Sequence, residues 1–259
     1  MKKTNVIVTG KSYLAPGIIS LWIKEEEMAK EAKPGQFLSI YCRDKSRLLP
    51  RPISICDVDP ENGVLRVVFR IAGAGTEELS KAAIGDLLSV LGPLGNGYDL
   101  REGCALLIGG GIGIPPMLFL AKELSKELTK EQMTVVLGYR DQNLFLAKEF
   151  EAFAEVVIAT DDGSVGIHGT VIDAVVSNEI FAEQVYACGP TPMLRGVKTF
   201  AEKAKIPAQI SLEEHMACGI GACLACVCQS NEVDTHTNVK NKRICKDGPV
   251  FDSEEVILA

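Results

Sequence analysis

Four cysteines near the C-terminal end of the chain have the spacing of metal ligands. Cys218 is followed after four residues by Cys223 and after two more by Cys226, and Cys245 comes further on. Plant-type ferredoxins hold a [2Fe–2S] centre on four thiolates with this spacing. Two glycines between the first two cysteines let the backbone curl tightly and aim N–H groups at sulfur. The pattern therefore predicts a protein-bound iron–sulfur cluster.

A structural zinc site is the main alternative for these cysteines. Zinc also accepts four thiolates, but its ligands usually come as two close pairs rather than as three close residues and a distant one. Cys228 is a fifth candidate ligand. The spacing favours Cys226, and we interpret Cys228 as a small buried residue.

A glycine-rich run follows the apolar segment 105–108 and has the form of a nucleotide-binding loop. It reads Gly109-Gly110-Gly111-Ile112-Gly113 and leads through two prolines into a helical pattern. Such a loop offers backbone N–H groups and a helix N-terminus to a pyrophosphate. Pro116 replaces the third glycine of the Rossmann fingerprint, which the first turn of a helix accepts. A tight structural turn would explain the run nearly as well.

Cys188 and Gly189 follow another apolar strand, in the motif Tyr186-Ala187-Cys188-Gly189-Pro190. Open α/β sheets bind ligands at the carboxyl ends of their strands. The motif therefore supports a nucleotide site, with a buried structural cysteine as the alternative.

Two segments with different hydrophobic patterns precede the cysteine cluster and are expected to position the candidate site residues. Up to about Tyr98, short strands such as 64–70 and 86–91 alternate with turn signals, which indicates an antiparallel barrel. From Cys104 to about Pro207, apolar strands alternate with amphipathic helices, which is typical of a parallel sheet with crossover helices. The expected strands there are 105–108, 134–137, 156–159 and 184–187. The first helix is expected to place Met117, Leu120, Ala121, Leu124 and Leu128 on one face.

The rest of the chain is too small to build a core without a staple, which a metal cluster would supply. We therefore expect domains at residues 1–100, 101–207 and 208–259.

Composition excludes several classes of function. The formal charge of −7 leaves no basic excess for nucleic acid or an anionic membrane surface. The N-terminal apolar run is too short for a signal peptide, so we expect a cytoplasmic protein, in which nine cysteines indicate metal or redox chemistry rather than disulfides. The uncharged stretch 103–121 holds five glycines and Pro115-Pro116, and is expected to be strand, loop and helix start rather than a membrane span.

Taken together, the motifs resemble the ferredoxin reductase superfamily. The order is a strand with Arg51-Pro52-Ile53-Ser54, the glycine loop, Cys188-Gly189-Pro190 and the four-cysteine tail. More narrowly, the whole chain resembles the electron-transfer subunits of two-component, NAD-linked (class 1B) dihydroorotate dehydrogenases. Lys33-Pro34-Gly35-Gln36-Phe37, Gly92-Pro93-Leu94-Gly95 and Cys245-Lys246-Asp247-Gly248-Pro249-Val250-Phe251 add to this resemblance.

The resemblance implies a Greek-key flavin-binding barrel, a Rossmann-like NAD domain and an iron–sulfur subdomain. Arg51 would contact the phosphates of FAD and Ser54 its ring. The other implied flavin residues are Pro52, Ile53, Val68, Phe69, Arg70, Gly75 and Thr76. Ile53 departs from the superfamily, which often has tyrosine there, so the resemblance does not say what covers the flavin ring.

By the same resemblance NAD would bind at the loop and at the second strand end. The implied contacts are Gly110, Gly111, Gly113, Cys188 and Gly189. After the next strand, Arg140 would attract and Asp141 would repel a 2′-phosphate; we favour NAD over NADP.

The implied function is electron transfer in pyrimidine biosynthesis. A hydride moves between NAD and FAD, and the cluster links FAD to the FMN of a catalytic partner, in a heterotetramer with two copies of each chain. FAD is needed because nicotinamide moves two electrons and a [2Fe–2S] centre one. No residues for acid–base or nucleophilic catalysis are evident. The alternatives are a related subunit of a ferredoxin:NADP reductase or sulfur-reducing hydrogenase complex, and a zinc-stapled binding module.

Overall fold

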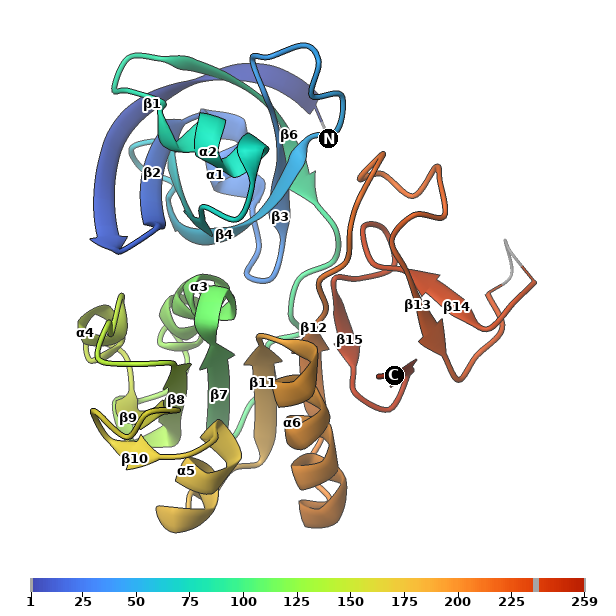
Figure 1. Ribbon diagram of the computed structural model, residues 1–259. Coiled ribbons are helices and arrows are strands. Elements are labelled where there is room, and N and C mark those ends of the chain that lie inside the picture. The colour runs from blue at the N-terminus through green and yellow to red at the C-terminus, as the bar shows by residue number, and fades with distance from the viewer. Residues whose placement is uncertain (1, 235–237, 259) are drawn as a thin grey trace.

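In this computed structural model, which describes residues 2–234 and 238–258, the N-terminal part of the chain forms a closed barrel (Figure 1). Its strands lie in the order β1-β2-β5-β4-β3-β6, and every neighbouring pair is antiparallel. The strands are β1 (Lys2–Ala15), β2 (Ile18–Lys24), β3 (Phe37–Tyr41), β4 (Arg51–Asp59), β5 (Val64–Arg70) and β6 (Leu87–Leu94). The predicted antiparallel barrel is confirmed.

Alternation along the strands fills the barrel interior. On β2, Ile19, Leu21 and Ile23 are fully buried in the barrel core, as the two-residue period of a strand requires. Two short helices, α1 (Glu26–Glu31) and α2 (Ala74–Ser80), add buried side chains to the same core.

The middle of the chain forms a sheet in the order β10-β9-β8-β7-β11-β12-β15. All pairs are parallel except β12 with β15. The strands are β7 (Ala105–Gly110), β8 (Met133–Tyr139), β9 (Glu155–Thr160), β10 (Ile167–His168), β11 (Gln184–Cys188), β12 (Ala208–Ser211) and β15 (Val250–Asp252). The helical elements are η1 (Gly111–Gly113), α3 (Ile114–Leu124), η2 (Lys130–Gln132), α4 (Ala147–Phe150), α5 (Val171–Ser177) and α6 (Thr191–Ala204). This parallel sheet with crossover helices is the predicted one.

The uncharged stretch 103–121 contains β7, η1 and most of α3, as predicted. The helix ends at Leu124, earlier than its periodic pattern suggests, because the Ser125 hydroxyl donates to the carbonyl of Lys122 and turns follow. Leu128 lies beyond the helix yet remains buried in the same core as Leu124. In the described residues, no helix has the length and hydrophobicity needed to cross a bilayer.

Charged contacts fix the barrel against the sheet domain. Arg66 on β5, with its side chain 8% exposed, donates to Ser20 Oγ and forms an ion pair with Glu149 on α4. Lys122 on α3 lies 2.7 Å from Asp57 Oδ1 on β4. Because these contacts join the two parts directly, they set the position of the barrel relative to the glycine loop.

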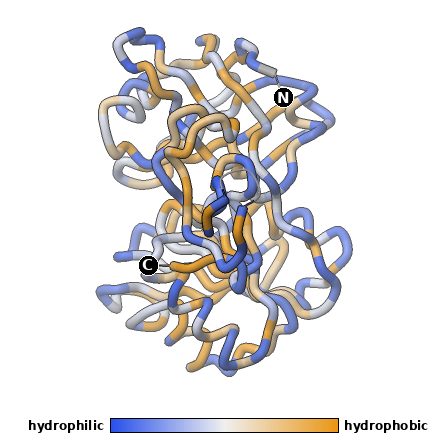
Figure 2. The backbone as a smooth tube through the Cα atoms, turned by 90° about the vertical axis from the view of Figure 1, so that its right-hand side faces the viewer, coloured by the Kyte–Doolittle hydropathy of each residue, from blue (hydrophilic) through white to orange (hydrophobic). Residues whose placement is uncertain are grey.

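The C-terminal segment lies across the junction of the barrel and the sheet (Figures 1 and 2). It forms a small sheet in the order β14-β13-β16, from β13 (Val227–Ser230), β14 (Asn241–Arg243) and β16 (Val256–Ile257). Ile244 and Phe251 share a core with Phe37 and Leu94 of the barrel. Since β12 and β15 join the larger sheet, strands from both sides of residue 207 belong to one sheet, and the domain boundaries stay a prediction.

Candidate functional site

The structure brings Cys218, Cys223, Cys226 and Cys245 together as two pairs of thiols. The sulfur atoms of Cys218 and Cys223 lie 3.3 Å apart, and both residues are half-buried. Cys226 and Cys245 are buried, and burial together with the neighbouring Cys226 thiol raises the pKa of Cys245. Iron binding would release that proton.

The loop between the first two cysteines wraps around the Cys218 sulfur. Burial alone would raise the pKa of Cys218, but the N–H groups of Ile220, Cys223 and Ala222 and the Cys223 thiol lower it to about 6. Gly221, with φ of +80°, donates its N–H to Cys245 Sγ at 3.1 Å. These N–H groups stabilise thiolates, the form that binds iron.

Arg243 and Asp247 hold the turn that carries Cys245. The buried guanidinium of Arg243 makes a two-point contact with Asp247, at 3.0 Å from Nε to Oδ2 and 3.1 Å from Nη2 to Oδ1. Its Nη1 lies 3.4 Å from the carbonyl of Gly221. Arg243 therefore connects the loop between Cys218 and Cys223 with the turn that carries Cys245. The sequence pattern did not indicate this role.

Cys228 lies apart from this group. Residues two apart on a regular strand share a face, but Cys226 precedes β13 and Cys228 lies within it. The Cys228 thiol is 3.6 Å from the carbonyl of Lys242 on the neighbouring strand.

The thiol arrangement fits a two-iron cluster. Two pairs can each bind one of two sulfide-bridged irons, which together need four thiolates. Among the described residues, no group of three or more His, Cys, Asp or Glu side chains is arranged around a single metal ion. The thiols are instead grouped in twos, and two protein thiolates are what each iron of such a cluster takes.

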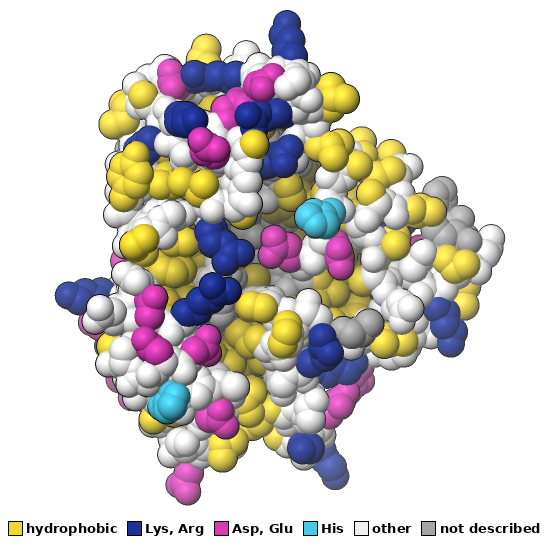
Figure 3. All heavy atoms as spheres, viewed as in Figure 1, with side chains coloured by type: hydrophobic (Ala, Val, Ile, Leu, Met, Phe, Trp, Pro, Cys, Tyr) yellow, Lys and Arg dark blue, Asp and Glu magenta, His cyan; other side chains and the backbone are white. Residues whose placement is uncertain are grey.

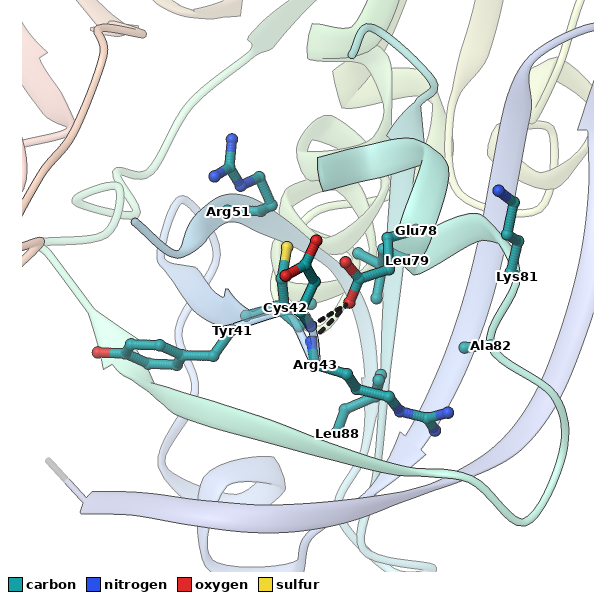
Figure 4. A pocket seen from close by; sticks show the side chains of 11 residues that line it. Tyr41, Cys42, Arg43, Arg51, Glu78, Leu79, Lys81, Ala82 and Leu88 are labelled. Atoms are coloured by element: carbon teal, nitrogen blue, oxygen red, sulfur yellow. Dashed lines mark hydrogen bonds between the residues drawn. The ribbon is translucent and has the colours of Figure 1, made fainter. Parts of the chain in front are cut away.

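Arg51 begins β4 and borders a cavity of about 310 Å³ on the barrel (Figure 4). One guanidinium nitrogen, Nη2, donates to the carbonyl of Leu49 at 2.8 Å, while the buried Nε has no hydrogen-bond partner. A Cβ added at Gly75 would lie 2.7 Å from that Nε, so α2 lies in close contact with the Arg51 side chain, and a larger residue would displace the guanidinium. A buried, unpaired guanidinium nitrogen suits a phosphate oxygen.

Glu78 organises the segment before Arg51 and was not predicted from the sequence. Its carboxylate accepts hydrogen bonds from the N–H groups of Arg43 and Asp44 and lies 3.3 Å from Arg47 Nε. This ties the chain between β3 and β4 to α2, the helix that approaches Arg51. The contacts of Glu78 join segments that are distant in sequence, so no local sequence motif predicts them.

The other predicted flavin residues differ in their surroundings. Pro52 and Ser54 are half-buried, whereas Ile53 and Phe69 lie in the barrel core. Val68 packs in the core that includes α3, and Arg70 is exposed. The Thr76 hydroxyl accepts hydrogen bonds from the N–H groups of Ala72 and Gly73. Thr76 therefore shapes the turn before α2, and its hydroxyl is already engaged.

The predicted nucleotide residues lie together at the carboxyl ends of β7 and β11. A Cβ added at Gly113 would lie 2.3 Å from the carbonyl oxygen of Cys188, and one added at Gly189 would lie 3.2 Å from Gly110 N. Gly111 is exposed with φ of +52°. Burial raises the pKa of the Cys188 thiol to about 12, although a hydrogen bond with Ser211 opposes the shift. This thiol is therefore neutral.

Met193 is a further residue of the nucleotide region that the sequence did not reveal. Its side chain lies against both Gly110 and Gly189, where a Cβ on either glycine would approach it to about 2.5 Å or less. Its position in the first turn of α6, just after Pro190, is the signal that could have identified it.

Comparison with known proteins identifies the same segments. The profile described as "Iron-sulfur cluster binding domain of dihydroorotate dehydrogenase B" matches residues 213–257. The profile described as "Oxidoreductase NAD-binding domain" matches residues 107–199. The chain thus contains both predicted kinds of segment, which argues against the zinc-stapled module.

Relatives match along nearly the full chain. The "Dihydroorotate dehydrogenase B (NAD(+)), electron transfer subunit" of Caldanaerobacter subterraneus subsp. tengcongensis is 42% identical over 90% of each chain. The protein of the same name from Streptococcus mutans is 41% identical, covering 99% of this chain and 98% of its own.

Solved structures share the fold. A chain from an NADH-dependent reduced ferredoxin-NADP oxidoreductase, studied for flavin-based electron bifurcation, has a TM-score of 0.87 and 33% identity, covering 98% of this chain and 90% of its own. A ferredoxin NADP+ reductase from Neisseria gonorrhoeae, with bound FAD and NADP, has a TM-score of 0.65 and 17% identity over 80% of this chain and 92% of its own.

Proposed function

Since the chain belongs to the family of dihydroorotate dehydrogenase B electron transfer subunits, we propose that it carries electrons between a catalytic partner that oxidises dihydroorotate and NAD+. The observation that carries this proposal is the arrangement of the four thiols in two pairs, on a loop whose Gly219 packs against Ser39 of β3. Strand β3 is paired with β4, the strand that begins at Arg51. A barrel, a nucleotide sheet and a cluster loop in contact form a short route for electrons. The reaction belongs to pyrimidine biosynthesis.

FAD, when bound, supplies the conversion between the two-electron chemistry of nicotinamide and the one-electron chemistry of the cluster. We propose that Arg51 binds its phosphates, since the buried Nε lacks a partner and borders a cavity. Gly75 leaves room for the guanidinium, and Thr76 fixes the turn beside it. Pro52, Ser54, Val68 and Arg70 would contribute edges of the site, while the side chains of Ile53 and Phe69 support it from the barrel core.

For the cluster, we propose Cys218 and Cys223 as ligands of one iron and Cys226 and Cys245 as ligands of the other. The close approach within each pair supports this division. The nine free cysteines also suit a cytoplasmic location, where thiols are kept reduced.

For the nucleotide, we propose that Gly110, Gly111, Gly113, Cys188 and Gly189 form the NAD site. Asp161 and Asp162 follow β9, next to the end of β8 where Arg140 and Asp141 lie. These carboxylates add negative charge that would repel a 2′-phosphate, which favours NAD over NADP.

A second candidate is the corresponding subunit of a ferredoxin-NADP oxidoreductase, which the 33% identical structure supports. The 42% and 41% identity to dihydroorotate dehydrogenase subunits favours the first proposal.

Reconstitution tests the proposal. We expect the isolated chain, loaded with FAD and cluster, to reduce artificial dyes with NADH and to leave dihydroorotate untouched, because it has no evident acid–base residues for removing a proton from carbon. Adding an FMN-containing catalytic subunit should restore NAD-linked orotate formation. Sedimentation of the mixture should show two copies of each chain. Orotate formation by the isolated chain would disprove the subunit assignment, and failure of the two chains to couple would favour the second candidate.

We propose that the partner docks on the exposed apolar rim of the cluster loop. Ile220 is 42% and Leu224 54% exposed, and they flank the half-buried Cys223. Hydrophobic side chains gather on the C-terminal segment where it adjoins the barrel (Figure 3). A partner that covers this rim would bring its own flavin close to the cluster.

Leu224→Asp should weaken docking, because the carboxylate would be buried in the interface without a partner. We expect a loss of about 2 kcal/mol or more in binding, roughly 30-fold, with NADH-to-dye turnover retained. Binding by titration calorimetry gives the measurement. Val176→Asp is the matched control, since Val176 is comparably exposed, at 62% against 54% for Leu224, but lies on α5 of the sheet domain. Equal binding by both variants would place the partner elsewhere.

A further inference from the structure

The buried hydroxyl of Ser39 lies beneath the loop between Cys218 and Cys223, which is called the cluster loop below. Its strand, β3, is paired with β4, the strand that begins at Arg51. Ser39 is on β3, paired with Pro52 of β4 on one side and with Leu91 of β6 on the other. Its neighbours Leu38 and Ile40 point into the barrel core, so alternation places Ser39 on the outer surface of the barrel. That surface is covered, because Ser39 is only 1% exposed.

The cluster loop provides the cover. A Cβ added at Gly219, the residue after Cys218, would lie 3.0 Å from Ser39 Oγ and 3.8 Å from Leu94 Cδ1. Gly219 has φ of +69°, a conformation that favours glycine. The first turn of the loop therefore rests directly on Ser39, and a side chain at position 219 would separate them.

Ser39 Oγ has no hydrogen-bond partner among the described residues. Burying a hydroxyl without a partner is unfavourable, and buried polar groups in proteins are generally satisfied. The N–H groups of Ile220, Ala222 and Cys223 are already directed at Cys218 Sγ, which makes the sulfur atoms the centre of this loop's hydrogen bonding. The Ser39 hydroxyl therefore lacks an acceptor, and it lies against a loop whose backbone N–H groups donate to a cysteine sulfur.

On this basis, and resting on the cluster site proposed above, we propose that Ser39 donates a hydrogen bond to a sulfur of the bound cluster. Hydrogen bonds to cluster sulfurs stabilise the added negative charge of the reduced state and so raise the reduction potential. Ser39 is then a barrel residue that contacts the cluster directly and tunes its potential. Because Ser39 of β3 is paired with Pro52 of β4, the hydrogen bond would join the barrel wall beside the proposed flavin site to the cluster.

Ser39→Ala tests this role in the loaded, full-length chain. The variant removes only an atom that has no partner in the protein, so folding and cluster content should be retained. EPR-monitored redox titration should show a lower cluster potential, with the equilibrium shifted toward the oxidised form by up to about tenfold, which is about 59 mV for one electron. Pulsed EPR in D₂O should also show one exchangeable proton fewer near the reduced cluster.

Ser230→Ala is the matched control. Ser230 is as buried as Ser39 and lies in the cluster segment, but its hydroxyl already donates to the carbonyl of Glu232 at 2.7 Å. Its removal should leave the potential unchanged. An unchanged potential and proton count in Ser39→Ala would overturn the inference, as would an equal shift in both variants. If the unaltered chain shows no [2Fe–2S] signal, the proposed function itself fails, which distinguishes the two.

Discussion

Arg51→Ala should release FAD from the protein while the cluster remains. The guanidinium is the one cation that both borders the barrel cavity and keeps a buried nitrogen without a partner in the described chain. Hydrogen bonds to charged groups contribute about 1.5–3 kcal/mol each, so losing one or two should weaken FAD binding by roughly tenfold to a thousandfold or more. Gel filtration followed by the flavin and iron–sulfur absorbance of the protein peak provides the measurement.

Two further variants make this result specific. Arg51→Lys keeps the charge but loses the planar fork, so it should retain FAD only in part. Arg43→Ala removes another arginine of the same cavity, whose guanidinium instead pairs with Asp86 at 3.0 Å, and it should keep its flavin. A full complement of FAD in Arg51→Ala would show that the pyrophosphate is bound elsewhere.

Local pattern was sufficient for much of the fold. The predicted strand 64–70 coincides with β5, because its β-branched and apolar residues directly follow the turn residues 60–63. The strand, glycine loop and helix start were likewise recognisable, since each depends on neighbours in sequence. The end of α3 was not, because a single serine hydroxyl competes with the helix for a backbone carbonyl.

Features that join distant segments were not predictable from the same patterns. The short strand β15 pairs with β12, although the whole cysteine segment separates the two strands in the sequence. Nothing in the three residues of β15 indicates which sheet the strand joins. The same limit applies to residues around the candidate sites. The spacing of the cysteines identified the candidate ligands, yet Arg243, Ser39 and Glu78 take their positions from contacts made only after the chain has folded.

The largest effect is expected from Cys223→Ser, which should abolish or badly perturb the cluster. Serine offers a hard hydroxyl where iron needs a soft thiolate, and Cys223 lies 3.3 Å from its partner Cys218. Cys228→Ser should keep the cluster, because that thiol lies against the carbonyl of Lys242. Iron content and the EPR signal of the reduced protein distinguish the two variants. A normal signal in the first variant, or its loss in the second, would mean that the ligands are assigned wrongly.

The same variant separates the two activities of the proposed subunit. Without the cluster, electrons have no route between the partner and the barrel, so NAD-linked orotate formation should stop. NADH-to-dye turnover should continue, because Arg51 and the glycine loop lie outside the cluster segment. FAD content and partner binding must first be shown to be intact, since the cluster also holds together a segment with a small core of its own. Coupled turnover at the normal rate without a cluster would rule out the proposed route, whereas loss of both activities with FAD still bound would mean that the cluster also supports the NAD site.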